Sequence, residues 1–137
     1  ELKSKINSYI IKTSKNKNTL IFYNKADKSK ISKFKKKGIV LIKSKIDRNR
    51  KMNIREVLKK LFNYGCRNLL IEGGNNLTNT LIKNKIFNKF YLLKSPKNLS
   101  KSSEYLKFSG MKTLNQKYKT KINLNLNLRK DRIILYR

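Results

Sequence analysis

A strand signal, a glycine pair and a helix signal follow one another in Leu69-Leu70-Ile71-Glu72-Gly73-Gly74-Asn75-Asn76-Leu77. Residues 68–71 end in a short apolar run, which is typical of a buried strand, and the glycines interrupt it. Leu77, Leu81 and Ile82 then recur at helical spacing, so we expect a helix capped by Asn75 or Asn76. The sequence therefore predicts a tight turn between a strand and a helix.

This turn has the properties of an anion site. Glycines let the backbone approach a ligand closely, and the N–H groups of the first helical turn, together with the positive end of the helix dipole, favour a phosphate. In an open α/β sheet such a turn also lies at the carboxyl ends of the strands, where ligands usually bind. Taken alone, however, the glycine pair is also explained by a tight turn with no ligand.

Glu72 strengthens the ligand interpretation. Burying a carboxylate at the end of an apolar strand costs free energy unless the carboxylate has a partner. The chain has only 7 Asp and Glu residues, and one of them stands directly beside the glycine pair. The structural alternative is an ion pair between Glu72 and one of the many lysines, which is common on protein surfaces.

Two strands and a helix are predicted upstream of the turn. Residues 19–23 and 39–42 are short apolar runs typical of buried strands. Between them we expect a helix that is capped by Asp27 or Ser29 and ended by Gly38. Strand and helix thus begin to alternate early in the chain.

The cleanest helical pattern follows the polar residues 43–52. Asn53 is the expected N-cap, Glu56 occupies the third helical position, and Gly65 stands where the helix should stop. The apolar residues share one stripe: Ile54, Val57, Leu58, Leu61 and Phe62.

The last part of the chain changes character. Residues 90–93 predict another strand, and the alternation up to this point favours crossover units on a largely parallel sheet. Residues 95–116 are polar and rich in turn residues. Residues 122–128 alternate between apolar and polar side chains, as in a half-buried strand, and residues 129–131 form a plausible turn into a strand over 133–136. We therefore expect an antiparallel hairpin at the end.

The charge balance is strongly positive. The chain has 36 Lys and Arg residues against 7 Asp and Glu, a formal net charge of +29. Such an excess attracts any polyanion, from nucleic acids to phosphorylated small molecules. The basic residues are mostly Lys, accompanied by abundant Asn and Ile, whereas phosphate and base recognition prefers Arg. We therefore attribute the charge to the coding bias of an AT-rich genome and rank nucleic acid below a small-molecule partner.

The rival function is that of a basic RNA-binding protein of ribosomal type, in which tyrosines would stack on bases. The candidates are Tyr9, Tyr23, Tyr64 and Tyr118. They lie within or beside apolar runs, where core packing is the simpler role, and no RNA-binding aromatic motif is present. RNA binding requires a continuous lysine patch on one face, whereas coding bias spreads lysines over every exposed face.

One cysteine and no histidine limit the chemistry further. They exclude an internal disulfide and a Cys-based metal cage, so we predict no metal site and a cytoplasmic protein. We expect Cys66 to be a buried residue at a strand edge rather than a nucleophile. No apolar run is long enough to cross a bilayer, so no membrane partner is expected, and the start at Glu1 predicts residues upstream.

The chain resembles the reductase domain of the bifunctional deaminase/reductase of riboflavin biosynthesis. The resemblance is sharpest over residues 68–97, through the Leu-Leu-Ile-Glu-Gly-Gly turn, the following helix, the strand at 90–93 and Ser95-Pro96-Lys97. Residues 3–42 are similar to the middle region of that domain, and the final hairpin is similar to its last strands. After Lys97 this chain is polar over residues 98–103, where the family is usually apolar and contains glycine.

The resemblance implies a dihydrofolate-reductase-like fold, which is a three-layer α/β/α domain with a mostly parallel sheet ending in an antiparallel C-terminal hairpin. Residues 1–137 would form a single, partial reductase domain. The implied reaction is the NADPH-dependent reduction of the ribosyl group of 5-amino-6-(5-phosphoribosylamino)uracil to the ribitylamino form. A homodimer and an upstream deaminase domain are also implied, with no zinc and no deamination in this segment.

The resemblance also assigns site residues. Glu72 would contact the phosphorylated substrate, and no catalytic residue is assigned, because the nicotinamide supplies the hydride. The cofactor would be lined by Gly74, Asn75, Asn76, Leu77, Thr78, Asn79 and Thr80. The family's first strands carry most of the substrate contacts and have no counterpart in residues 1–137, so the sequence supports the cofactor class better than the substrate. A pterin-type reductase of the same fold is a further alternative.

Overall fold

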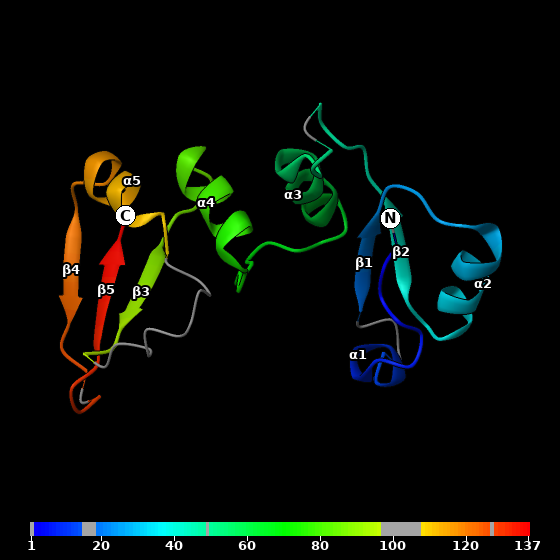
Figure 1. Cartoon of the computed structure of the whole chain (residues 1–137), viewed down its shortest axis with the longest axis horizontal. Coiled ribbons are helices and arrows are strands. Elements are labelled where there is room, and N and C mark those ends of the chain that lie inside the picture. The colour runs from blue at the N-terminus through cyan, green and yellow to red at the C-terminus, as the bar shows by residue number, and fades with distance from the viewer. Residues whose placement is uncertain (1, 15–18, 49, 97–107, 127) are drawn as a thin grey trace. The chain divides into compact units, whose positions relative to one another are not determined.

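A computed structural model describes residues 2–14, 19–48, 50–96, 108–126 and 128–137 of the chain. Helices and strands both occur (Figure 1), and the fold belongs to the α/β class. In chain order the elements are α1 (Tyr9–Lys12), β1 (Leu20–Tyr23), α2 (Lys28–Lys36), β2 (Val40–Lys43), α3 (Ile54–Asn63), α4 (Asn75–Lys83), β3 (Phe90–Lys94), α5 (Met111–Lys117), β4 (Lys121–Leu124) and β5 (Arg132–Tyr136). They form two compact units, residues 1–69 and 70–137, which are described separately.

The first unit is built on a parallel strand pair. Strands β1 and β2 run in the same direction, with Leu20 opposite Val40, and α2 makes the crossover between them. A small core joins the start of the chain, α1, α2 and the start of β2. Its buried members are Leu2, Ile11, Phe34 and Ile39. The predicted strands at 19–23 and 39–42 and the helix between them are confirmed.

Helix ends in this unit follow the predicted chemistry closely. Asn53 is the N-cap of α3, and its side chain accepts hydrogen bonds from the backbone N–H groups of Arg55 and Glu56. Gly38 and Gly65 follow α2 and α3 with positive φ angles of 82° and 107°, a conformation that glycine adopts without steric cost. Asp27 is the N-cap of α2 by position, but its side chain makes no capping bond.

The strand predicted at residues 68–71 is not formed. This segment joins α3 to α4 as extended chain outside every strand, and the side chains of Leu69 and Leu70 are 48% and 82% exposed. A strand exists only where a neighbour satisfies its N–H and C=O groups, and none of the described strands pairs with this segment. Cys66 is half-buried in the same connection, so its predicted place at a strand edge is also wrong.

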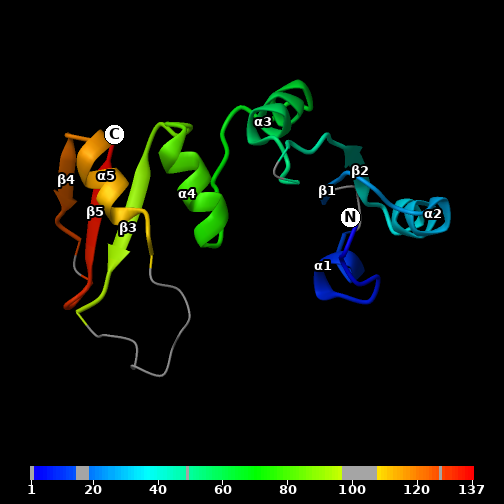
Figure 2. The same ribbon diagram turned by 45° about the horizontal axis from the view of Figure 1, so that its top comes forward.

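The second unit contains a three-stranded antiparallel sheet in the order β3–β5–β4. Helices α4 and α5 pack on one face of it (Figures 1 and 2). The core between helices and sheet is centred on Ile82, Leu114, Tyr118 and Tyr136. The Phe87 ring stacks on Tyr118 with centroids 4.6 Å apart. The predicted helix after the glycine pair and the strand at 90–93 are confirmed. The C-terminal hairpin is also formed, but its first strand ends at Leu124 and does not extend over the predicted residues 122–128.

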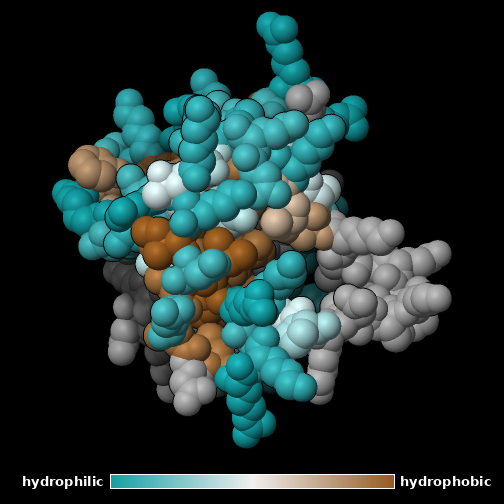
Figure 3. Space-filling model, turned by 90° about the vertical axis from the view of Figure 1, so that its left-hand side faces the viewer, coloured by the Kyte–Doolittle hydropathy of each residue, from teal (hydrophilic) through white to brown (hydrophobic). Residues whose placement is uncertain are grey.

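The opposite face of this sheet is apolar and partly exposed. The strand register places Tyr91 and Leu93 of β3 on it, beside side chains of β5 and β4. Leu93 is 71% exposed and Tyr91 is 47% exposed. Ile122 and Leu124 of β4 lie on the same face, which is turned away from α4 and α5. An apolar area framed by hydrophilic residues is visible on this side of the molecule (Figure 3).

Two expectations about the sheet need correction. Parallel pairing among the described strands is confined to β1 and β2, because β3 lies beside β5 instead of a strand at 68–71. Helix α5 begins within residues 95–116, a region predicted to be polar and turn-rich only, and extends one residue beyond it. Its signal is the spacing of Met111, Leu114 and Tyr118, which places three apolar side chains on one helical face. The single-domain expectation stays a prediction.

Candidate functional site

The turn before α4 presents an open helix N-terminus. Gly74, and not Asn75 or Asn76, is the N-cap residue, with φ −67° and ψ 170°. The first intrahelical bond runs from Thr78 N to Gly74 O, at 3.1 Å. The backbone N–H groups of residues 76 and 77 precede this first bond and point out of the N-terminal end of the helix. Together with the helix dipole, they form a positive site for an anion.

The two glycines of the turn have different surroundings. A Cβ atom added at Gly73 would lie 2.8 Å from Leu77 Cδ2, so the helix packs directly against the backbone there. A Cβ atom added at Gly74 would meet nothing within 4 Å. Thr78 Oγ1 donates to Gly73 O at 3.2 Å and holds the turn against the first helical residues. Gly73 thus leaves room for the Leu77 side chain, whereas Gly74 leaves open space at the N-terminal end of the helix.

Glu72 is exposed at the start of this turn. The ion pair that the structure records over its described residues joins Glu56 to Lys60, at 2.7 Å, and none is recorded there for Glu72. Among the described residues, the alternative of an ion pair between Glu72 and a lysine is therefore not formed. Its carboxylate remains accessible two residues before the helix N-cap.

The seven residues predicted to line the cofactor do not all share one face. Gly74, Asn76 and Leu77 are exposed, while the others, from Asn75 to Thr80, are half-buried. Thr80 lies more than a turn beyond the N-cap, and its hydroxyl donates to Asn76 O at 2.8 Å. A helix turns once in 3.6 residues, so the first turn is the part best placed to meet a ligand. The full set stays a prediction.

One side of α4 carries a polar network that was not predicted. Asn79 Nδ2 donates to Asn75 Oδ1 at 2.9 Å and to Ser109 Oγ at 2.6 Å. The Ser109 hydroxyl in turn donates to Asn75 Oδ1 at 3.5 Å. Ser109 lies 30 residues beyond Asn79 in the chain, and only the fold brings them together. Gly110, directly after Ser109, marks the start of α5 in the sequence, but no local pattern links Ser109 to α4.

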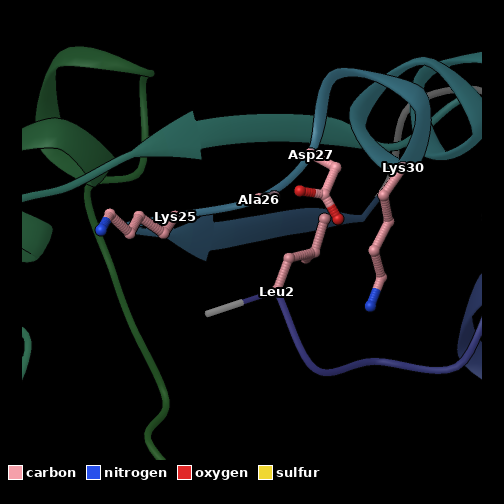
Figure 4. Close-up of a pocket in the computed structure, with 5 residues that line it drawn as sticks. All are labelled: Leu2, Lys25, Ala26, Asp27 and Lys30. Carbon is pink, nitrogen blue, oxygen red and sulfur yellow. The ribbon is translucent and has the colours of Figure 1, made fainter.

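A cleft in the first unit lies at the start of α2 (Figure 4). It is lined by Leu2, Lys25, Ala26, Asp27 and Lys30. Leu2 N donates to Lys25 O at 3.1 Å, which ties the start of the chain to the segment after β1. Figure 4 shows the Asp27 carboxylate directed toward Leu2 and the Lys25 ammonium extending away from it. None of the predicted site residues lines this cleft.

Comparison with known proteins identifies the family. A family model, RibD C-terminal domain, matches residues 1–130. The chain belongs to this family. A relative is the riboflavin biosynthesis protein RibD of Actinobacillus pleuropneumoniae. It is 27% identical to the chain over 97 residues. That match covers 71% of the chain and 26% of the relative, so the chain spans about a quarter of that protein's length.

Family membership confirms the resemblance inferred from the glycine turn and its surroundings. The matched range includes every predicted site residue of the RibD C-terminal domain chain, from Glu72 to Thr80, and Ser109 as well. Among the residues described, no helix of this chain combines the length and apolar character needed to span a membrane.

Proposed function

We propose that the chain supplies the cofactor-binding part of an NADPH-dependent reductase of riboflavin biosynthesis. The reaction proposed is reduction of the ribosyl group of 5-amino-6-(5-phosphoribosylamino)uracil to the ribitylamino form. The observation that carries the proposal is the open N-terminus of α4 behind Gly74, in a chain of the RibD C-terminal domain family. The name of the bacterial relative, a riboflavin biosynthesis protein, supports the pathway.

The residues of the turn fit a phosphate-bearing cofactor. NADPH would supply the hydride, and the protein's task is to bind, align and exclude water. The backbone N–H groups of residues 76 and 77 would hold the diphosphate, which can approach closely because Gly74 has no side chain. No His or Cys is needed for these steps, in agreement with a chain that has no His.

Glu72 fits a role toward the substrate. An ionised carboxylate accepts hydrogen bonds and donates none, and the hydroxyl groups of a ribosyl chain are donors. Exposed beside the helix mouth and without an ion pair in the described structure, Glu72 can orient such hydroxyls next to the bound cofactor. We therefore assign it to substrate binding, with the substrate phosphate attracted by the positive surface.

We further propose that residues 1–137 form a single, partial three-layer α/β/α reductase domain. It would belong to a cytoplasmic, homodimeric protein that carries a deaminase domain upstream. Support for a third layer comes from the second unit. Helices α4 and α5 cover one face of the β3–β5–β4 sheet, and the other face is apolar, with Leu93 71% exposed. Apolar surface of this kind is stabilised when another layer covers it.

The RNA-binding alternative is less well supported. Basic residues are spread over the whole chain, with 21 of the 36 in residues 1–69 and 15 in residues 70–137. Tyr118 is buried against Phe87 and so cannot stack on a base, and Tyr23 is partly buried against the core of the first unit. Tyr9 and Tyr64 are exposed, but they stand on different helices. Tyr9 is the first residue of α1 and Tyr64 is the C-cap of α3.

The proposed function is tested by fluorescence titration of the purified chain with NADPH, with NADH and with a single-stranded RNA at several salt concentrations. A reductase gives saturable NADPH binding that persists at about 0.15 M salt, where the Debye length is about 8 Å and surface attraction is screened. RNA binding that outcompetes NADPH and falls steeply with salt would support the RNA-binding alternative. Turnover of a pterin in place of the uracil substrate would support the pterin-type reductase.

A further inference from the structure

The second unit contains a residue that the predicted cofactor site does not include. Ser109 stands in the loop before α5 and closes a ring of hydrogen bonds with Asn75 and Asn79 of α4. Asn75 is the first residue of the helix and lies directly after Gly74, at the mouth proposed to hold the diphosphate. The network therefore joins the loop before α5 to the candidate site.

The amide of Asn79 is directed toward the loop before α5. Its Nδ2 atom donates to both Asn75 Oδ1 and Ser109 Oγ, which employs both of its N–H groups. Its Oδ1 atom lies on the side of Gly110, only 2.9 Å from where a Cβ of that residue would stand. A side chain engaged in this way holds the orientation of its neighbours.

Gly110 keeps the loop close to the helix. A Cβ atom there would lie 2.5 Å from Phe108 Cζ in addition to the contact with Asn79. The residue is buried and begins α5, whose Leu114 is fully buried against the core that includes Ile82 of α4. The position of Ser109 beside Asn79 is thus fixed by core packing on one side and by the absence of a side chain on the other.

We propose that Ser109 is a positioning residue of the cofactor site and acts through Asn79 and Asn75. This inference rests on the proposed NADPH-binding function. By holding the oxygen of the Asn75 amide toward the network, Ser109 and Asn79 fix the orientation of the first side chain of α4 before a ligand arrives. A side chain ordered in advance loses less conformational freedom on binding, so the affinity for the cofactor is higher.

The test is a set of NADPH titrations paired with urea denaturation. Ser109→Ala removes the hydroxyl, and we expect the dissociation constant for NADPH to rise about fivefold, as for the loss of about one net hydrogen bond. Ser109→Thr keeps the hydroxyl and should bind as the wild type does. Ser29→Ala removes an exposed hydroxyl of α2, in the other unit, and serves as the matched control. The urea midpoint should stay unchanged in all three, because Ser109 is also exposed.

A double-mutant cycle measures whether Ser109 and Asn79 act together on NADPH binding, which a purely structural role of Ser109 would not produce. If Ser109 acts through Asn79, the variant with both Ser109→Ala and Asn79→Ala should bind NADPH no more weakly than Asn79→Ala alone. Additive losses would overturn the inference, as would equal binding by the wild type and Ser109→Ala. A fall in the urea midpoint that accounts for the lost binding would also overturn it. If the wild type fails to bind NADPH saturably, the proposed function fails, and this inference falls with it.

Discussion

The sharpest test of the anion site is a pair of substitutions at Gly74 that differ only in charge. Gly74→Asp and Gly74→Asn introduce side chains of nearly the same shape at the N-cap of α4. The φ and ψ angles of −67° and 170° are allowed for any residue, and a Cβ atom there meets nothing within 4 Å. Both side chains are also preferred N-caps, so each should leave helix stability unchanged or raise it by a few tenths of a kcal/mol.

The two variants should differ in NADPH binding because only one adds a negative charge. Either side chain can accept the N–H groups that a phosphate would use, which weakens binding in both. In Gly74→Asp the carboxylate also repels the diphosphate. Two unit charges about 5 Å apart near a protein surface repel by about 1 to 3 kcal/mol, for an effective dielectric constant between about 80 and 20. We therefore expect the Asp variant to bind at least about fivefold more weakly than the Asn variant.

The assay is NADPH fluorescence titration at low salt and at about 0.15 M salt, with urea denaturation of each variant as the control. The difference between Asp and Asn should shrink with salt, because part of the repulsion is screened, but should not vanish at such close range. Equal dissociation constants for the Asp and Asn variants would refute the placement of a phosphate at the mouth of α4. Wild-type affinity in both would refute any ligand contact at Gly74.

Three further predictions concern stability. Asn53→Ala removes the side chain that caps α3, and we expect it to lower the free energy of unfolding by about 1 kcal/mol in urea denaturation, whereas Asn53→Asp should not. Ile82→Ala removes a side chain that is 0% exposed from the core of the second unit, and a loss of about 2 to 5 kcal/mol is expected; a loss below about 1 kcal/mol would mean that this core is not packed as described. The surface hydrogen bond from Lys60 lowers the pKa of Glu56. The pair therefore stabilises the fold above the ordinary glutamate pKa, and this stabilisation is lost as the pH falls through the lowered pKa. Urea midpoints measured from neutral to acidic pH should show this loss in the wild type and a smaller one in Glu56→Gln, and identical profiles would contradict it.

The candidate site was only partly predictable from the sequence. The turn itself was found because a glycine pair between an apolar run and a helical pattern is a local signal, and α4 begins there. The cap was assigned to Asn75 or Asn76, although Gly74 fills that place, because asparagine is the more frequent cap and the boundary of a helix is set by its packing. Ser109 could not be found, since no local pattern links it to a residue 30 positions earlier.

Local chemistry was enough for most helix and strand positions in this protein. Gly38 and Gly65 end helices because they take positive φ angles, Asn53 caps α3 through its own side chain, and short apolar runs become β1, β2 and β3. These outcomes depend on residues within a few positions of one another, so they can be read from the order of the residues alone.

Strand pairing and burial were decided only by the tertiary structure. Residues 68–71 have the composition of a strand, yet they stay unpaired among the described strands, because a strand needs hydrogen-bond partners that its own sequence cannot supply. β3 pairs with β5, about 40 residues away, and this long-range pairing makes the sheet of the second unit antiparallel. The same pairing turns Ile122 and Leu124 away from the helices. Contacts between distant segments depend on the packing of the whole unit, which local patterns do not contain.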